Sequence, residues 1–188
     1  MPSPKLRVPP LPRPFHLVLV EPEIPQNTGN IARLSAATQC PLHLVGRLGF
    51  RLDERSVRRA GIDYWHLVTL QTHPDWAAFA LRHAQIAPGA SVRLFSATGR
   101  RSYVDAPFAP GDALVFGTES TGIPAALLER YDGEVYGIPT AGAVRSLNLA
   151  SAAAIVLYEA LRATGALSGA KLEDPGPDAH PEPDGFVR

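Results

Sequence analysis

Short apolar runs alternate with helical segments along most of this chain, and that alternation limits the possible folds more than any other feature of the sequence. Runs typical of buried strands occur at 16–20, 42–45, 66–70, 92–96, 113–116 and 134–138. Helical spacing or capping signals occur at 27–38, 53–60, 74–84, 124–131 and 147–164, with Pro74 expected in the first turn of its helix. Strands separated by helices predict an α/β fold, in which a mostly parallel sheet has helices on both faces.

One domain is expected over 15–167, because no internal repeat or change of composition interrupts this stretch. Residues 1–14 are basic and rich in proline, and residues 168–188 are acidic and rich in proline and glycine, so both are expected to be disordered tails. The sequence shows no signal-peptide pattern and no apolar run of membrane length. Cys40 is the single cysteine, which suits a reducing compartment. We therefore expect a cytoplasmic protein.

The formal charges of the chain cancel, since 18 lysines and arginines balance 18 aspartates and glutamates. Contact with nucleic acid would therefore depend on a local patch and not on an overall basic surface. The six histidines lack the spacing of metal ligands and are interpreted as surface or satisfied core residues, so no metal is expected. The glycine-rich dinucleotide and P-loop motifs and the nucleophile elbow of serine hydrolases are absent from the sequence.

Four polar loops follow predicted strands, at 21–30, 97–101, 117–124 and 139–148. Ligands of open α/β sheets bind beyond the carboxyl ends of the strands, so these loops together predict a site, although any one of them could be a plain polar connection. The last loop places Arg145, Ser146 and Asn148 at the start of a helix, beside unpaired backbone N–H groups and the positive end of the helix dipole. Such groups suit a nucleoside-like ligand with an anionic partner.

Three segments in and beside these loops form ordered motifs: Asn27-Thr-Gly-Asn-Ile-Ala-Arg33, Phe116-Gly-Thr-Glu-Ser-Thr-Gly-Ile-Pro124 and the segment from Ile138-Pro to Ser146-Leu-Asn-Leu149. Together they resemble the three motifs of the SpoU branch of the SPOUT RNA 2′-O-methyltransferases. The segment 58–65, Arg-Arg-Ala-Gly-Ile-Asp-Tyr-Trp, and the short length resemble, within that branch, the subfamily that methylates the cytidine or uridine at the wobble position of tRNA. Thr121 departs from the pattern, because many relatives have arginine there.

The resemblance implies S-adenosylmethionine-dependent methyl transfer to a ribose 2′-hydroxyl in the anticodon stem-loop of tRNA. It also implies a deep trefoil knot in the C-terminal third of the chain and a homodimer in which both subunits contribute residues to each active site. A knot is rare, and no periodicity in the sequence would predict one. Three alternatives remain open: the same reaction on ribosomal RNA or at another tRNA position, a knotted RNA-binding protein without catalysis, and a nucleotide-binding regulator without an RNA partner.

By position in the motifs, the resemblance implies that the cofactor contacts Ala97, Thr98, Gly117, Glu119, Gly122, Ile138, Ser146 and Leu147. It assigns catalytic roles to Asn30, Arg33, Glu119, Arg145, Ser146 and Asn148. Because a guanidinium holds its proton tightly, Arg33 is expected to hold a phosphate and stabilise the developing alkoxide instead of acting as a base. Glu119 is expected to act by charge near the sulfonium or by ordering its loop, or else to cap the helix that starts at Pro124.

A basic segment beside the motifs is the expected RNA-binding surface. The residues expected to contact RNA are Asn27, Arg51, Arg55, Arg58, Arg59, Arg100 and Arg101. Arginines suit this role because phosphate contacts position an RNA on a protein. A solvated, ion-paired helix face would explain the arginines at 51–59 equally well.

Overall fold

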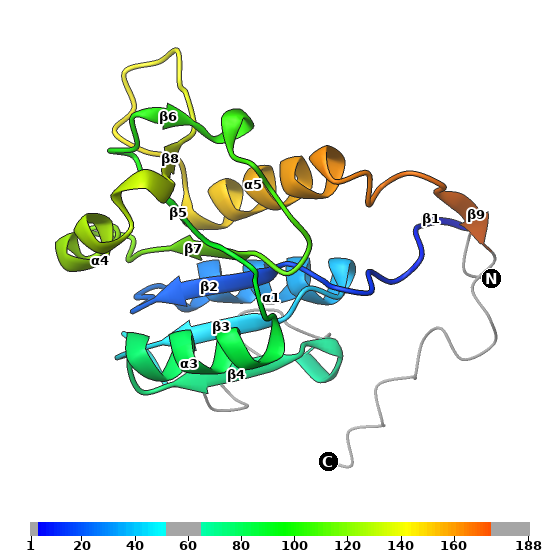
Figure 1. Ribbon diagram of the computed structural model, residues 1–188, viewed down its shortest axis with the longest axis horizontal. Helices are drawn as coiled ribbons and strands as arrows, with labels where there is room; N and C mark the ends of the chain where they lie inside the picture. The colour runs from blue at the N-terminus through cyan, green and yellow to red at the C-terminus, as the bar shows by residue number, and fades with distance from the viewer. Residues whose placement is uncertain (1–3, 52–64, 174–188) are drawn as a thin grey trace, which may run out of the picture.

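A seven-stranded parallel sheet forms the centre of the protein in the computed structural model, which describes residues 4–51 and 65–173 (Figure 1). Within these residues the strands are β2 (His16–Val20), β3 (Leu42–Val45), β4 (Leu70–His73), β5 (Val92–Phe95), β6 (Arg101–Ser102), β7 (Ala113–Phe116) and β8 (Val135–Gly137). They are ordered β4-β3-β2-β7-β5-β8-β6, and every neighbouring pair is parallel. The predicted α/β fold with a mostly parallel sheet is confirmed.

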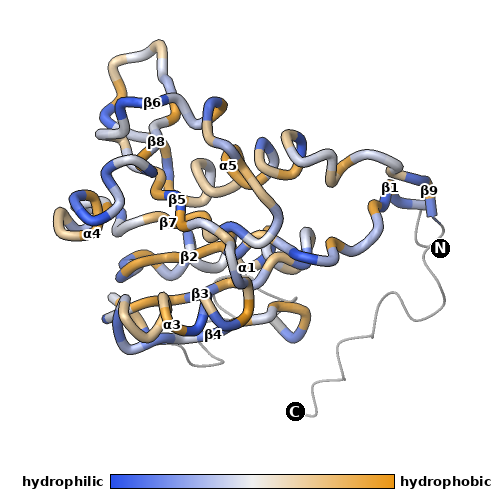
Figure 2. Tube along the Cα trace, in the orientation of Figure 1, coloured by the Kyte–Doolittle hydropathy of each residue, from blue (hydrophilic) through white to orange (hydrophobic). Residues whose placement is uncertain are grey.

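Helices cover both faces of this sheet (Figure 1). The helices are α1 (Pro25–Thr38), α3 (Trp76–Ile86), α4 (Ala125–Arg130) and α5 (Leu149–Ala163), and single 3-10 turns are η1 (Trp65–Leu67), η2 (Tyr103–Asp105) and η3 (Asp132–Glu134). Alternate strand residues point to opposite faces. Leu17 and Leu19 of β2 pack in the core cluster that includes Val156 of α5, whereas Val18 packs in the cluster that includes Phe79 of α3. Both faces of the central strands are therefore buried, and Figure 2 shows β2 as strongly hydrophobic.

Most predicted elements agree with the structure, and two differ in ways that have a physical reason. The predicted strand at 66–70 is wrong, because this segment forms η1 and an extended link, and β4 begins only at Leu70. Register with the buried strand β3 sets this start, since Leu70 pairs with Leu42. Pro74 precedes its helix, because Asp75 is the N-cap and accepts a hydrogen bond from the amide of Ala78 at 2.8 Å. The helix predicted at 53–60 lies outside the described residues.

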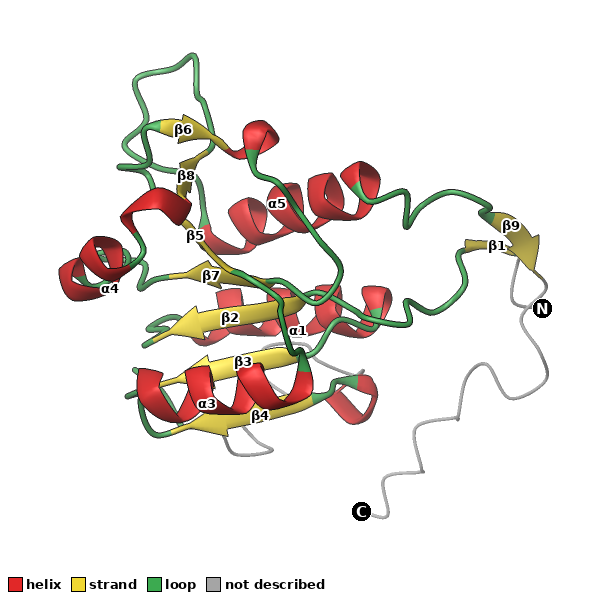
Figure 3. Ribbon diagram, in the orientation of Figure 1, coloured by secondary structure: helices red, strands yellow, loops and turns green. Residues whose placement is uncertain are grey.

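A two-stranded antiparallel ribbon brings together two segments that were expected to lie in disordered tails. β1 (Lys5–Arg7) pairs with β9 (Lys171–Glu173), with Lys5 opposite Glu173 (Figure 3). The sequence did not predict this ribbon, because both strands are short and exposed. No helix within residues 4–51 and 65–173 has the length and apolar character to cross a membrane.

Four histidines gather under α3 on one face of the sheet. The ring nitrogens Nδ1 of His16 and Nε2 of His43 lie 2.9 Å apart, and Nδ1 of His43 lies 3.0 Å from Nε2 of His73. His83 adds a contact of 3.0 Å between its Nε2 and the carbonyl oxygen of Gly111. Burial, and to a smaller extent the charge repulsion of neighbouring histidines, lowers the pKa of His16 to about 4 and of His43 to about 3. These four are satisfied core histidines, one of the two roles expected for them.

Candidate active site

A pocket of about 580 Å³ lies beyond the carboxyl ends of β5, β7 and β8. Its walls come from the loops that follow these strands and from the segment 145–149, which leads into α5. This is the edge of the sheet where the polar loops were expected to converge. The volume is within the range of small-molecule and cofactor sites.

The pocket collects residues that are far apart in the sequence. Every residue expected at the cofactor contributes to its lining: Ala97, Thr98, Gly117, Glu119, Gly122, Ile138, Ser146 and Leu147. Of the residues expected to be catalytic, Glu119, Arg145, Ser146 and Asn148 also line it. Phe95, Phe116 and Ile138 give part of the wall an apolar character beside these polar groups. The mixture of apolar surface and a few polar side chains is typical of small-molecule and cofactor sites.

Two glycines shape the 117–122 loop. A Cβ added at Gly117 would overlap the backbone of Gly122 and Ile123. Gly122 has a φ of +77°, a left-handed conformation that favours glycine. The loop closes through two backbone hydrogen bonds between Thr118 and Gly122, at 3.0 and 3.1 Å. The fold therefore requires glycine at both positions in order to bring the loop backbone to the pocket wall.

Glu119 caps a helix, but not the helix suggested by its position in the sequence. Its carboxylate accepts hydrogen bonds from the backbone amides of Glu23 at 2.8 Å and Ile24 at 3.2 Å. These amides stand at the start of α1, whose N-cap residue has no side-chain hydrogen bond of its own. The N-cap of α4, Pro124, also has no side-chain hydrogen bond. A carboxylate at the positive end of α1 is electrostatically favourable, so the geometry agrees with the loop-ordering interpretation of Glu119.

Asn27 and Asn148 join the same carboxylate to α5. Asn27 donates from Nδ2 to Glu119 at 2.9 Å and accepts at Oδ1 from Asn148 at 2.9 Å. Asn148 is the N-cap of α5 and accepts from the amides of Ala150 and Ser151. The predicted helix start near residues 146–148 is confirmed. One hydrogen-bonded chain thus links all three sequence motifs.

This network corrects one expectation. Asn27 was expected to contact RNA, but the residue is 5% exposed and both ends of its side-chain amide are used inside the protein. An amide whose donor and acceptor are both occupied in a buried site has little capacity left for a ligand. The structure therefore gives Asn27 an internal role in holding the motifs together.

Asn30 and Arg33 lie outside the pocket lining. They are exposed residues of α1, separated by three positions, so they share one side of the helix. Arg145 is exposed at the pocket rim. The structure therefore separates the expected catalytic residues into a group that lines the pocket and a pair on the outer side of α1.

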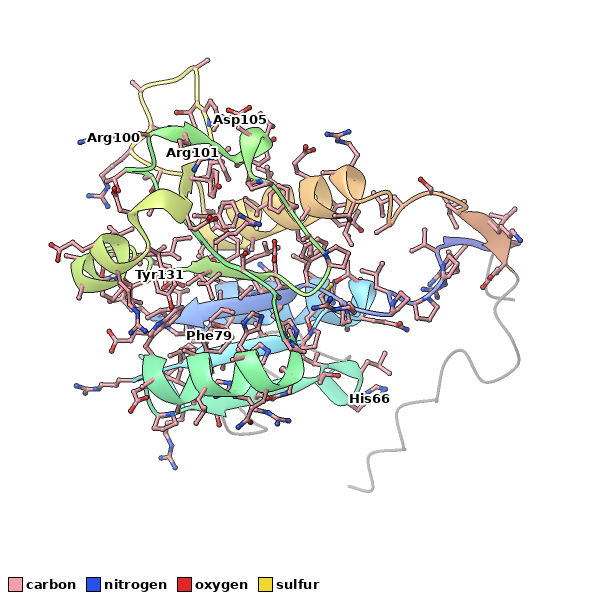
Figure 4. The ribbon with its side chains drawn as sticks, viewed as in Figure 1. His66, Phe79, Arg100, Arg101, Asp105 and Tyr131 are labelled. Carbon is pink, nitrogen blue, oxygen red and sulfur yellow. The ribbon has the colours of Figure 1, made fainter. Side chains whose placement is uncertain are left out.

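The arginines expected to contact RNA fall into three groups. Arg101 donates from Nη1 to the carbonyl of Gly133 at 2.6 Å, and its Cζ lies 4.7 Å from the centre of the Tyr136 ring, so it packs β6 onto η3 and β8. Arg100 is exposed and points outward in Figure 4, and Arg51 is also exposed. Arg55, Arg58 and Arg59 lie outside the described residues.

Sequence reasoning missed Glu23. Its carboxylate accepts hydrogen bonds from the amide of Ser120 at 3.0 Å and from the hydroxyl of Ser120 at 2.8 Å. The two residues are 97 positions apart, and each is an ordinary polar residue of its own loop. Only the three-dimensional structure shows that they meet.

Comparison with known proteins gives a consistent result. The model of the SpoU rRNA Methylase family matches residues 14–158. A curated relative from Acidovorax sp. (strain JS42), named tRNA (cytidine(34)-2′-O)-methyltransferase, is 48% identical over 151 residues, which cover 79% of this chain and 91% of that protein.

Solved structures extend this similarity to three dimensions. A structure from a study of the 2-OH methylation of C/U34 on tRNA is 48% identical and has a TM-score of 0.74, covering 81% of this chain and 97% of that one. The SpoU methyltransferase AviRb from Streptomyces viridochromogenes, in complex with the cofactor AdoMet, is 28% identical with a TM-score of 0.67, covering 82% of this chain and 62% of that one.

Proposed function

This chain belongs to the SpoU rRNA methylase family, and we propose that it methylates the ribose 2′-hydroxyl of the wobble nucleotide of tRNA, a cytidine or a uridine, with S-adenosylmethionine as the methyl donor. It is an enzyme, a tRNA 2′-O-methyltransferase. The observation that carries the proposal is the convergence of the three sequence motifs on one hydrogen-bonded pocket wall, in a chain 48% identical to a tRNA (cytidine(34)-2′-O)-methyltransferase over 91% of that protein.

The pocket fits S-adenosylmethionine in size and chemistry. Ile138 and Leu147 offer apolar surface and backbone groups for the adenine, and Gly117 with Gly122 allows a close approach to the loop backbone. Ala97, Thr98 and Ser146 would contact the remaining parts of the cofactor. When bound, S-adenosylmethionine supplies a methyl group on a sulfonium, which is already a good electrophile. The residues of the pocket therefore have to bind, orient and exclude water.

Arg33, Asn30 and Arg145 would act on the methyl acceptor. The guanidinium of Arg33 would hold a phosphate beside the target ribose and stabilise the alkoxide that develops as the 2′-hydroxyl loses its proton. Asn30, on the same side of α1, and Arg145, at the pocket rim, would orient the ribose. Ser146 and Asn148 would hold the loop at the junction of the two sites. Alignment of the acceptor oxygen with the methyl group supplies much of the acceleration in such a reaction.

A homodimer would complete the active site, because Arg33 lies outside the pocket of its own chain. The described surface of α5 leaves Ile155 and Tyr158 exposed at 37% and 49%, and this apolar surface suits contact with a second copy. In that arrangement the partner's Arg33 would face the pocket. tRNA as the substrate also favours a cytoplasmic location.

We propose, in addition, that the C-terminal part of the 15–167 domain forms a deep trefoil knot. The support is the order of three strands: β8 lies between β5 and β6, which follow each other directly in the sequence. A later segment is thus inserted between two strands that were already connected. The resemblance to the SpoU branch, which implies the knot, agrees with the similarity of the fold to a SpoU methyltransferase structure.

Methyl transfer to defined tRNA tests the function. Purified full-length protein is incubated with labelled S-adenosylmethionine and an unmodified tRNA transcript, beside the same transcript carrying 2′-deoxyribose at nucleotide 34. We expect label at nucleotide 34, none in the deoxy transcript, and a large loss in Arg33→Ala. Labelling of ribosomal RNA alone would refute the tRNA assignment, and labelling of neither RNA would refute the enzyme.

A further inference from the structure

The loop before α1 and the 117–122 loop are joined by hydrogen bonds to two carboxylates, one from each loop. Glu119 accepts hydrogen bonds from the amides of Glu23 and Ile24. Glu23 in turn accepts from the amide and the hydroxyl of Ser120, at 3.0 and 2.8 Å. Each loop therefore supplies one carboxylate and two or more donors to the other. The arrangement is reciprocal, and all four hydrogen bonds have a charged acceptor, which makes them stronger than neutral ones.

Glu23 does not itself line the pocket, whereas Ser120 does. Glu23 is exposed, so neither burial nor core packing explains it. Glu21 lies two positions earlier in the same loop, is also exposed, and makes none of these contacts. The side-chain carboxylate of Glu23 therefore acts on the pocket through Ser120.

Two sets of hydrogen bonds fix the 117–122 loop. One set, through Glu119 and Glu23, joins it to the start of α1, and the other joins Thr118 to Gly122 within the loop. α1 carries Arg33 on its outer side. A displacement of this loop from α1 would change both the pocket wall and the position of the pocket relative to α1.

We propose that Glu23 is a positioning residue: through Ser120 it fixes the 117–122 loop against α1 and so sets the geometry of cofactor binding. This inference rests on the proposed function for the identity of the ligand, but its structural part does not need the ligand. Glu23 is needed to keep the loop closed in the free protein.

Amide hydrogen exchange in the cofactor-free protein tests the structural part. We expect Glu23→Ala to accelerate exchange at the amide of Ser120, and to a smaller extent at the amides of residues 23 and 24. Glu23→Gln can still accept from the amide and donate to the hydroxyl of Ser120, so it should lie between Glu23→Ala and the wild type. Glu21→Gln is the matched control and should leave the exchange rate of Ser120 unchanged.

Binding of S-adenosylhomocysteine, measured by calorimetry on the same variants, tests the link to the pocket. Loss of the charged acceptor in Glu23→Ala should raise Kd about tenfold, the equivalent of one charge-assisted hydrogen bond. Ser120→Ala should raise Kd less, because its amide remains, and it should add nothing when combined with Glu23→Ala. The Michaelis constant for tRNA should stay at the wild-type value in Glu23→Gln.

Unchanged exchange at Ser120 in Glu23→Ala would overturn the inference and leave the proposed function intact. So would a Kd equal to that of Glu21→Gln. If Glu23→Ala does not fold, Glu23→Gln and Ser120→Ala carry the test. Failure of the proposed function gives a different result, because wild-type protein would then transfer no methyl group while the exchange pattern at Ser120 would still depend on Glu23.

Discussion

Asn148, the N-cap of α5, donates a hydrogen bond of 2.9 Å to the buried Asn27 of α1, across 121 positions of the sequence. The same Asn27 donates to Glu119, so one side chain connects two helix starts and the 117–122 loop. The pocket wall is therefore built by asparagines that use both ends of their amides. This relationship makes the polar groups interdependent, because each lost contact leaves its neighbour unsatisfied.

Asn27→Asp should weaken cofactor binding, although it only replaces the side-chain NH2 group with an oxygen. The new carboxylate loses the donor to Glu119 and places a second negative charge beside it. We expect a loss of about 1–3 kcal/mol in the free energy of unfolding, the cost of an unsatisfied buried polar group, and weaker cofactor binding. Urea denaturation and calorimetry measure the two effects. Gln26→Glu, an exposed change on the same helix, should have little effect; equal losses in both variants would contradict the network.

Gly117→Ala should abolish cofactor binding by displacing the 117–122 loop. The added methyl group would overlap the backbone of Gly122, so the loop must move away from its present position. The expected loss of stability is about 1–3 kcal/mol, as for other overpacked sites. Gly142→Ala is the control, since an added Cβ meets no atom within 4 Å there. Thermal unfolding with and without S-adenosylhomocysteine shows the result, and ligand-induced stabilisation of Gly117→Ala would contradict it.

Arg33→Lys should lower kcat without changing cofactor affinity. Lysine keeps the positive charge but loses the planar pair of donors that suits a phosphate. Because Arg33 does not line the pocket of its own chain and is assigned to the methyl acceptor and not to the cofactor, calorimetry with S-adenosylhomocysteine should give the wild-type Kd. Single-turnover methyl transfer should slow about 100-fold, the usual cost of removing one transition-state donor. Weakened cofactor binding with an unchanged rate would place Arg33 in the cofactor site instead.

The buried histidines should make the protein less stable in mild acid. Folded-state pKa values of about 4 for His16 and about 3 for His43 lie below the ordinary value of 6.5, so at pH 7.5 both states are neutral and no effect is present. As the pH falls below 6.5, His16 and His43 bind protons in the unfolded chain but stay neutral in the folded protein. Each histidine then costs about 2 kcal/mol of unfolding free energy by pH 5.

Urea denaturation at pH 7.5, 6 and 5 measures this loss. Titrating carboxylates also contribute in acid, so the double variant His16→Gln/His43→Gln serves as the reference and should show a shallower decline. Parallel pH profiles for the two proteins would show that the protonation of these two rings does not control stability in acid.

The central strands were predictable because their patterns are local. The run 113–116 is apolar throughout, as a strand buried on both faces requires, and its predicted bounds agree with β7. β4 was misplaced, because the segment 66–70 contains Leu67, Val68 and Leu70 and resembles a strand, whereas pairing with β3 decides where the strand begins. β6 has only two residues and leaves no periodic signal.

The pocket lining was predictable from the motifs, but the contacts within it were not. The positions of Gly117 and Ser146 in loops after strands indicated which edge of the sheet they share. The sequence suggested three roles for Glu119, namely charge near the sulfonium, ordering of its loop or capping of the helix at Pro124, but it did not indicate the contacts with the start of α1. These contacts form because the fold brings the free amides of Glu23 and Ile24 to the carboxylate. The pairing of Glu23 with Ser120 and the clustering of four histidines involve residues far apart in the chain, and no local sequence pattern indicates which of these residues meet.

The ribbon of β1 and β9 holds the two ends of the described chain opposite each other, with Lys5 facing Glu173. A peptide bond made between these strands would turn the linear polypeptide into a ring with little change of shape. In a chain with the proposed knot, that ring would be a closed trefoil, which no degree of unfolding could untie. Refolding of the ring would then need no threading step, and the difference between its folding rate and that of the linear chain would measure how long threading takes.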